Sequence, residues 1–160
     1  MSQLKNMIAR WAQPGVVTWL GLRPARRARM HVVQEAQIGL DGLAGDRSRA
    51  GKRAVTLIQA EHLPAIGAYL GRDAVDPMDL RRNIVISGLN LASLKDRQIA
   101  IGDAVLHLSV ICAPCSRMEE TFGCGGYAAV RGHGGWCAEV ITPGVVRIGD
   151  PVCPVDRVAD

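Results

Sequence analysis

Apolar residues gather in short runs that are rich in Val and Ile and end at Gly, Pro or Asp. Runs of this kind predict β-strands. The predicted strands are Val16–Leu20, Met30–Gln37, Ala54–Ile58, Asn83–Ser87, Gln98–Ile101, Ala104–Ile111, Ala138–Thr142 and Val145–Ile148. Thr142–Val145 and Ile148–Pro151 carry the residues typical of tight turns.

Helical patterns are few. Leu57–Leu70 has helix-like apolar spacing, interrupted by Pro64 and followed by Gly71 as a stop. Ser116–Phe122 predicts a short helix with Ser116 as N-cap and Glu119 as its capping-box partner. The glycine-rich stretch 122–136 predicts a loop, either one that approaches a ligand closely or a flexible surface loop. Many short strands with few helices favour a mainly β barrel or sandwich.

Composition narrows the class. The chain has 160 residues, 48% apolar and 21% charged, which predicts a single domain over 1–160 with a real core. No stretch reaches the roughly 20 apolar residues of a membrane helix, and the N-terminus lacks a signal-peptide pattern. We therefore expect a cytoplasmic protein with no membrane partner. Aromatic residues make up only 4%, which disfavours a stacking platform for single-stranded nucleic acid.

Positive charge is concentrated in residues 22–53, where eight basic residues face three acidic ones, an excess of +5. Arginine forks suit phosphate and carboxylate. We expect the cluster Arg26, Arg27 and Arg29 to be solvated surface. Nucleic acid is an unlikely partner, because binding it calls for a broader basic excess.

Five cysteines are present, and in a reducing compartment they serve as thiols, ligands or catalysts. In Val110–Met118 a strand runs into a turn and presents a thiol where a helix N-terminus and Arg117 favour thiolate. Four interpretations compete. They are buried packing (which suits Cys137 and Cys153), a redox pair of Cys112 and Cys115, a zinc site of Cys112, Cys115, Cys124 and Cys137, and a single metal-ligating cysteine.

Several segments, in order along the chain, resemble the MOSC domain, named for the C-terminal domain of molybdenum-cofactor sulfurase. The resemblance covers about residues 15–153. The segments are Gly42–Arg47 (GLAGDR), Gly51–His62 (GKRAVTLIQAEH), Arg81–Leu91 (RRNIVISGLNL), Ile101–Leu106 (IGDAVL), Ala113–Glu119 (APCSRME), Arg131–Val140 (RGHGGWCAEV) and Pro143–Asp150 (PGVVRIGD).

The resemblance implies a β-barrel of the pyruvate-kinase-insert type that binds a pterin-based molybdenum cofactor. In the family a cysteine of the Pro-Cys pattern carries sulfur or ligates molybdenum, and here it maps onto Cys115. A second cysteine found in some relatives is replaced by Met118. The first motif often carries a His two residues after Gly-Asp, where this chain has Ser48.

The pterin cofactor ends in a phosphate, which needs arginine forks and N–H donors. Arg53 and Arg82 lie beside strand starts, and Asn83 adds an amide for the pterin edge. Arg117 adjoins the thiol. Each arginine is alternatively a surface ion pair, with Asp46, Asp79 or Glu119 as available partners.

His133 lies between glycines in the segment where the family shapes its substrate mouth. We list it as a catalytic candidate, although a solvated histidine is the commoner outcome. His62 and His107 are expected to be structural.

Three functions remain open. The first is a molybdenum-dependent reductase of N-hydroxylated compounds, with a small-molecule substrate and electrons from a separate reductase, because the chain lacks a ferredoxin-type cysteine cluster. The second is a sulfur carrier or cofactor-binding module that holds a persulfide on Cys115. The third is a thiol-disulfide protein that uses Cys112 and Cys115.

Overall fold

The structure is a computed structural model that describes residues 2–155. Its strands are β1 (Gly15–Leu22), β2 (His31–Val33), β3 (Glu35–Gly39), β4 (Gly42–Leu43), β5 (Val55–Gln59), β6 (Ile84–Ser87), β7 (Gln98–Ile101), β8 (Ala104–Ile111), β9 (Trp136–Thr142), β10 (Gly144–Arg147) and β11 (Pro151–Pro154). Its helices are α1 (Gln3–Ala9), α2 (His62–Tyr69), α3 (Pro77–Leu80), the 3₁₀ turn η1 (Leu91–Leu94), α4 (Ser116–Phe122) and α5 (Gly126–Val130). No helix within residues 2–155 is long and apolar enough to cross a membrane.

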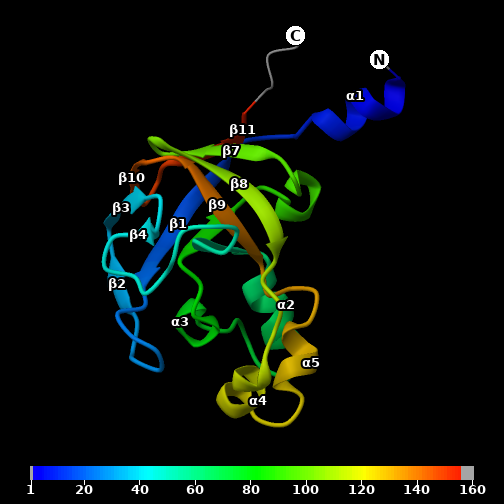
Figure 1. Cartoon of the computed structure of the whole chain (residues 1–160). Helices are drawn as coiled ribbons and strands as arrows, with labels where there is room; N and C mark the ends of the chain where they lie inside the picture. Colours follow the sequence, from blue (N-terminus) through cyan, green and yellow to red (C-terminus); the bar gives the residue numbers. More distant parts are fainter. Residues whose placement is uncertain (1, 156–160) are drawn as a thin grey trace.

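Seven strands of the described chain close into a barrel in the order β11-β7-β8-β9-β5-β6-β1, and β11 pairs back onto β1 (Figure 1). Strand β2 extends the sheet beyond β1, and β10, β3 and β4 form a second, smaller sheet. Barrel neighbours are antiparallel except β5 and β6, which are parallel. A parallel pair needs a crossover connection, and α2 and α3 lie on it. The expected mainly β barrel with a few short helices is confirmed.

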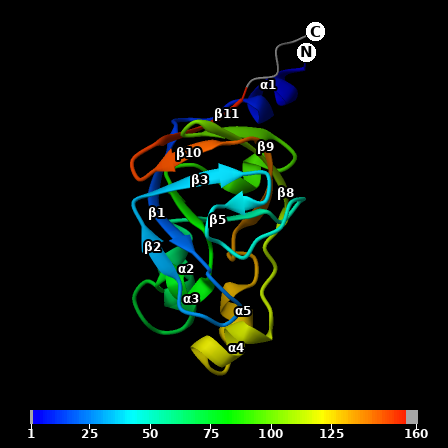
Figure 2. The same cartoon turned by 60° about the vertical axis from the view of Figure 1, so that its left-hand side comes forward.

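Two apolar cores hold the chain together. The first fills the barrel with side chains such as Leu20, Leu57 and Leu106. The second lies outside β5 and β6, where Ile58 packs with Met118 and other side chains from the helices. Figures 1 and 2 show α2, α3, α4 and α5 gathered at one end of the barrel, away from the two termini.

The structure agrees with most predicted strands and corrects the helix predicted over Leu57–Leu70. Gln98–Ile101 and Ala104–Ile111 coincide with β7 and β8, whereas Met30–Gln37 is divided between β2 and β3. The segment Leu57–Gln59 ends β5, and the helix spans only His62–Tyr69. Every residue of β5 is buried, since one face lines the barrel and the other meets the helices. In a strand that is buried on both faces, apolar and polar residues do not alternate, so its sequence resembles that of a buried helix.

Two local predictions also change, and one predicted turn is followed by a strand that was not predicted. Cys115, not Ser116, is the N-cap residue of α4, and Glu119 accepts hydrogen bonds from the Gly125 and Tyr127 amides at the start of α5. The predicted glycine-rich loop contains α5. The turn at Ile148–Pro151 leads into β11, which closes the barrel.

Candidate functional site

Cys115 lies in the wall of a cavity of about 400 Å³ at the helical end of the barrel. Its side chain is exposed and makes no capping hydrogen bond to α4, so its sulfur is open to a ligand. The same wall contains one carboxylate, that of Glu120, and several arginines. These are Arg23, Arg26, Arg27, Arg47, Arg81, Arg82 and Arg117.

The wall comes from four separate parts of the chain: the loop after β1, the loop after β4, the link between α3 and β6, and α4 with the residue before it. Within residues 2–155, two of these arginines form ion pairs. Arg23 pairs with Asp46 at 2.9 Å, and Arg27 with Glu120 at 3.4 Å. The other five have no carboxylate partner in the described chain, so the cavity carries a net positive charge that suits an anion.

Asp46 holds one side of this wall. Its carboxylate is fully buried and accepts hydrogen bonds from the Arg23 backbone amide (2.7 Å), Arg23 Nε (3.1 Å), Arg23 Nη2 (2.9 Å) and Asn83 Nδ2 (3.1 Å). Burial raises the pKa of Asp46, but the hydrogen bonds and charge of Arg23, with the bond from Asn83, outweigh it and lower the pKa overall. Asp46 is therefore an ionised positioning residue at pH 7.

Asn83, predicted to bind the pterin edge, is fully buried. Its Nδ2 group donates to the Gly21 carbonyl and to Asp46, and its Oδ1 accepts from the backbone amide and hydroxyl of Thr56. The side chain thus joins β1, β5 and the loop that carries Asp46. With both amide hydrogens engaged, it positions the wall and offers no open donor to a ligand.

Arg82 is 7% exposed and lines the cavity. Its Nε donates to the Gly134 carbonyl at 2.6 Å and its Nη1 to the Leu80 carbonyl at 2.6 Å. A Cβ on Gly134 would lie 3.2 Å from Arg82 Nη2. Gly134 therefore permits a close approach to Arg82, whereas the sequence suggested an approach to a ligand.

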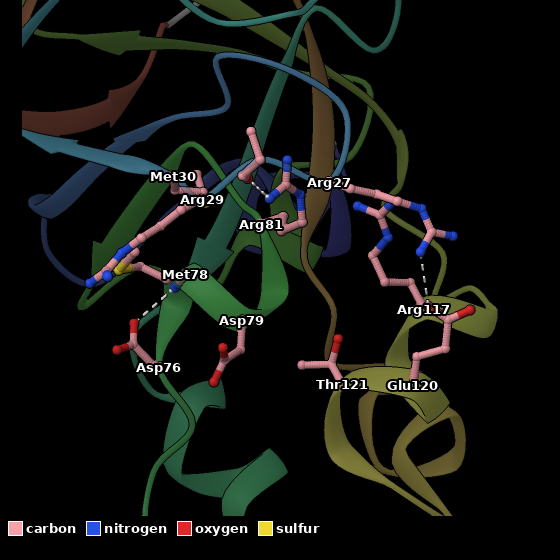
Figure 3. Close-up of a pocket in the computed structure, with 11 residues that line it drawn as sticks. Arg27, Arg29, Met30, Asp76, Met78, Asp79, Arg81, Arg117, Glu120 and Thr121 are labelled. Carbon is pink, nitrogen blue, oxygen red and sulfur yellow. Dashed lines mark hydrogen bonds and ion pairs between the residues drawn. The ribbon is translucent and has the colours of Figure 1, made fainter.

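The basic surface continues in two neighbouring cavities. Arg53 lines one of about 310 Å³ with Arg49, and this cavity shares Arg23 and Arg47 with the cavity at Cys115. The other, of about 540 Å³, shares Arg117 and three further residues with it (Figure 3).

Figure 3 shows Asp76 and Asp79 on the α3 side of this larger cavity, with Arg27 and Arg117 on the α4 side. Burial, and then the charge of Asp76, raise the pKa of Asp79. The arginines of the cluster Arg26–Arg29 are exposed, as expected of solvated surface, and Arg26 and Arg27 also line the wall at Cys115.

His133 is not among the residues that line the Cys115 cavity. Its ring lies against those of His62 and Tyr69, with centroids 5.0 and 5.5 Å away. Burial and the charge of His133 lower the pKa of His62. The structure therefore brings Cys115, Arg82 and Arg117 together, with Arg53 in the adjoining cavity, and places His133 elsewhere.

Sequence reasoning missed six charged residues of the site: Arg23, Arg26, Arg27, Arg47, Arg81 and Glu120. The charge excess over residues 22–53 already signalled Arg23 and Arg47, but no pattern along the chain separates site arginines from solvated ones. Only folding brings the loops that carry them to one end of the barrel.

The other cysteines lie outside this wall. Cys137 is buried in β9, as the buried-packing interpretation expects, and Cys153 is half-buried in β11. Cys112 lies close enough to Cys137 for each thiol to shift the pKa of the other, and it lines a different cavity. Within residues 2–155, no three His, Cys, Asp or Glu side chains group as metal ligands, which argues against the four-cysteine zinc site.

Comparison with known proteins adds a family and a fold. The family model described as MOSC domain matches residues 30–153. The YuaD protein from Bacillus subtilis has a similar structure, with a TM-score of 0.76, 19% identity and coverage of 88% of this chain and 94% of that one. YiiM from Escherichia coli gives a TM-score of 0.73 at 22% identity, covering 93% and 73% of the two chains. YiiM from Geobacillus stearothermophilus gives 0.72 at 19%, covering 90% and 76%. A comparison with curated proteins gives no match.

Proposed function

The chain belongs to the MOSC domain family, which is associated with binding of the molybdenum cofactor, and we propose that it reduces N-hydroxylated compounds at that cofactor with Cys115 as a molybdenum ligand. One observation carries the proposal: an exposed thiol lies in a cavity wall with seven arginines and one carboxylate. A small-molecule substrate and a separate electron-donating reductase are part of it.

The residues present fit the cofactor. A phosphate monoester carries a charge of about −1.5 to −2 near neutral pH, and arginine forks are its preferred partners. Five wall arginines have no carboxylate partner within residues 2–155, and the adjoining cavity adds Arg49 and Arg53. Thiolate is a suitable soft ligand for a metal already held by sulfur. We infer that Cys115 binds the metal and that the arginines bind the cofactor's anionic groups.

When bound, the cofactor would supply the electrons that break the N–O bond. The chain's own residues would then orient the substrate and provide protons. Arg117 lines both the Cys115 cavity and the larger one, where it can orient a polar substrate. Glu120 also lines both and is the wall's carboxyl group, which makes it our candidate for taking up a proton and delivering it to the departing oxygen.

Metal analysis of freshly purified protein tests the proposal. We expect stoichiometric molybdenum in the wild type, loss of it in Cys115→Ala and retention in Cys112→Ala. A reductase-coupled assay with hydroxylamine derivatives should then show turnover that follows the molybdenum content. Molybdenum retained in Cys115→Ala, or silence across a broad substrate panel with loaded protein, contradicts the proposal.

A sulfur carrier is the second candidate, favoured by the same exposure of the Cys115 thiol. Its signature is a cyanide-labile sulfur that Cys115→Ala abolishes, in protein that holds no molybdenum even from a cofactor-replete host. The thiol-disulfide function with Cys112 and Cys115 has less support, because the Cys112 thiol interacts with that of Cys137 and lines a different cavity from Cys115.

A further inference from the structure

Cys112 and Cys137 are 25 positions apart in sequence but adjacent in the fold. Strands β8 and β9 pair with Ile111 opposite Trp136, and the Cys112 amide donates to the Gly135 carbonyl at 2.9 Å. Because side chains alternate along strands, Cys112 and Cys137 share the face opposite to that of Ile111 and Trp136. The two thiols lie close enough for each to shift the pKa of the other.

The two thiols are not equivalent. The hydrogen bond from Cys137 is the main cause that lowers the pKa of Cys112; burial opposes it, and the charges of Arg82, Arg23 and Arg53 add to it. The same bond, together with burial, raises the pKa of Cys137. Cys112 is therefore the thiolate of the pair and Cys137 the thiol that donates to it.

Arg82, whose charge helps to lower the pKa of Cys112, also favours a thiolate at this position. Its guanidinium is nine-tenths buried, and its hydrogen bonds go to backbone carbonyls. No carboxylate pairs with it in residues 2–155. A buried cation without a counter-charge is unfavourable, and the Cys112 thiolate supplies that counter-charge.

Cys112 borders a small cavity that is separate from the one at Cys115. Cys112 lines a cavity of about 80 Å³ with His62 and Trp136, and this cavity shares no lining residue with the one at Cys115. One water needs about 10–15 Å³ of such space. The cavity therefore accommodates a hydroperoxide, but not a tripeptide disulfide such as oxidised glutathione.

We propose that Cys112 and Cys137 form a second thiol site, in which a small hydroperoxide oxidises them reversibly to a disulfide. The Cys112 thiolate attacks one peroxide oxygen; the O–O bond breaks, and the leaving oxygen takes a proton and departs as water or an alcohol. The Cys112 sulfenic acid then reacts with Cys137, forming the S–S bond and releasing water. Two thiols lose two electrons in all, and the peroxide gains them. This proposal does not depend on the molybdenum proposal.

The disulfide would alter the neighbourhood of Cys115 in two ways. It would remove the thiolate beside Arg82, which lies in the wall of the Cys115 cavity. It would also tie the end of β8 to β9 three residues before Cys115, fixing one end of the segment that carries this thiol.

Tryptic mapping of the full-length protein tests the pairing directly. Cleavage after arginine and lysine places Cys112 and Cys115 in peptide 98–117, Cys124 in 118–131, Cys137 in 132–147 and Cys153 in 148–157. After hydrogen peroxide treatment and alkylation, we expect 98–117 to be linked to 132–147. Dithiothreitol should release the link, and oxidised glutathione should leave Cys112 unmodified.

Variants assign the link to its cysteines. It should persist in Cys115→Ser and Cys153→Ser and disappear in Cys112→Ser and Cys137→Ser, with circular dichroism confirming that each variant folds. A disulfide within peptide 98–117, a link that Cys115→Ser abolishes, or peroxide oxidation without any link overturns the proposal. A glutathione adduct on Cys112 overturns the size restriction that the cavity implies.

Discussion

Replacing Asp46 with Asn removes the buried negative charge that holds Arg23 against the wall of the Cys115 cavity. The carboxylate accepts three hydrogen bonds from Arg23 and one from Asn83. An asparagine keeps one oxygen acceptor but turns N–H groups toward donors of Arg23 or Asn83. The substitution therefore loses the ion pair and leaves hydrogen-bond donors facing each other.

The expected loss in the free energy of unfolding follows from the burial of Asp46 and Arg23. Removing one partner of a buried ion pair costs roughly 3–5 kcal/mol. The Asp46 side chain is fully buried, but that of Arg23 is 19% exposed, so water recovers part of the loss. We therefore expect a loss of about 2–4 kcal/mol in the free energy of unfolding. With a urea m-value of about 2 kcal/mol/M, the midpoint should fall by roughly 1–2 M.

Urea unfolding of wild type and Asp46→Asn across pH is the assay. The folded-state pKa of Asp46 is lowered, so its carboxylate stabilises the fold above the unfolded-state pKa of about 3.9 and loses that effect as pH falls through the folded-state value. The stability difference between the two proteins should be constant from about pH 7 to pH 5 and shrink below about pH 4.

Asp41→Asn is the matched control, because Asp41 is exposed and forms no ion pair within residues 2–155. It should change the unfolding free energy by less than about 0.5 kcal/mol. A loss below about 1 kcal/mol in Asp46→Asn, or a loss of the expected size that does not shrink in acid, refutes the assignment of a buried, charge-dependent contact.

Further predictions address the proposed proton donor, a glycine and the proposed Cys112 thiolate. Glu120→Gln should lower the turnover number by about 10²-fold or more with unchanged molybdenum content, as expected for loss of a proton donor and measured in the reductase-coupled assay. Gly135→Ala should destabilise the fold by about 3 kcal/mol or more in urea unfolding, because the new Cβ would clash with the Leu57 carbonyl oxygen. Gly132→Ala is the control: Gly132 also has a positive φ, but the space around it is open, so the cost should be about 1–2 kcal/mol. The rate at which peroxide forms the Cys112 disulfide should change little between about pH 7 and 9, because the lowered pKa of Cys112 keeps the thiolate formed. The thiolate fraction of an ordinary thiol, with a pKa of about 8.5, rises about 25-fold over that range.

The barrel was largely predictable from the sequence because most of its strands carry a local signal. Runs of Val and Ile between turn residues located β7 and β8 to the residue. Elements without such a signal were missed. The strand β11 begins at a proline after a turn and is defined by pairing with β1 and β7, which lie far away in sequence. The helix α5 has five residues between glycines and is stabilised by Glu119 and the second core.

The site was predictable as a kind of chemistry but not as a set of residues. A thiol and arginine forks were expected, and Cys115, Arg82 and Arg117 do lie together. Asn83 was expected at the ligand but is fully used in joining β1, β5 and Asp46. No local sequence feature shows whether an amide side chain beside a strand start is buried and joins neighbouring segments, or is exposed and donates to a ligand. That distinction arises only when three distant segments meet.

The spacing of the cysteines likewise does not predict which thiols lie together, and this bears on function. A Cys-x-x-Cys spacing pairs thiols when both residues lie in one turn, but here Cys112 is held at the end of an extended strand by the Gly135 carbonyl. Extension directs its side chain across to β9 and Cys137, while Cys115 follows the turn into the arginine cavity. The two sulfurs therefore experience different surroundings: one meets a thiol donor and a buried guanidinium, the other an open basic cavity. A ligand role for Cys115 and a redox role for Cys112 can thus coexist in one small barrel, because the turn at Pro114 separates them.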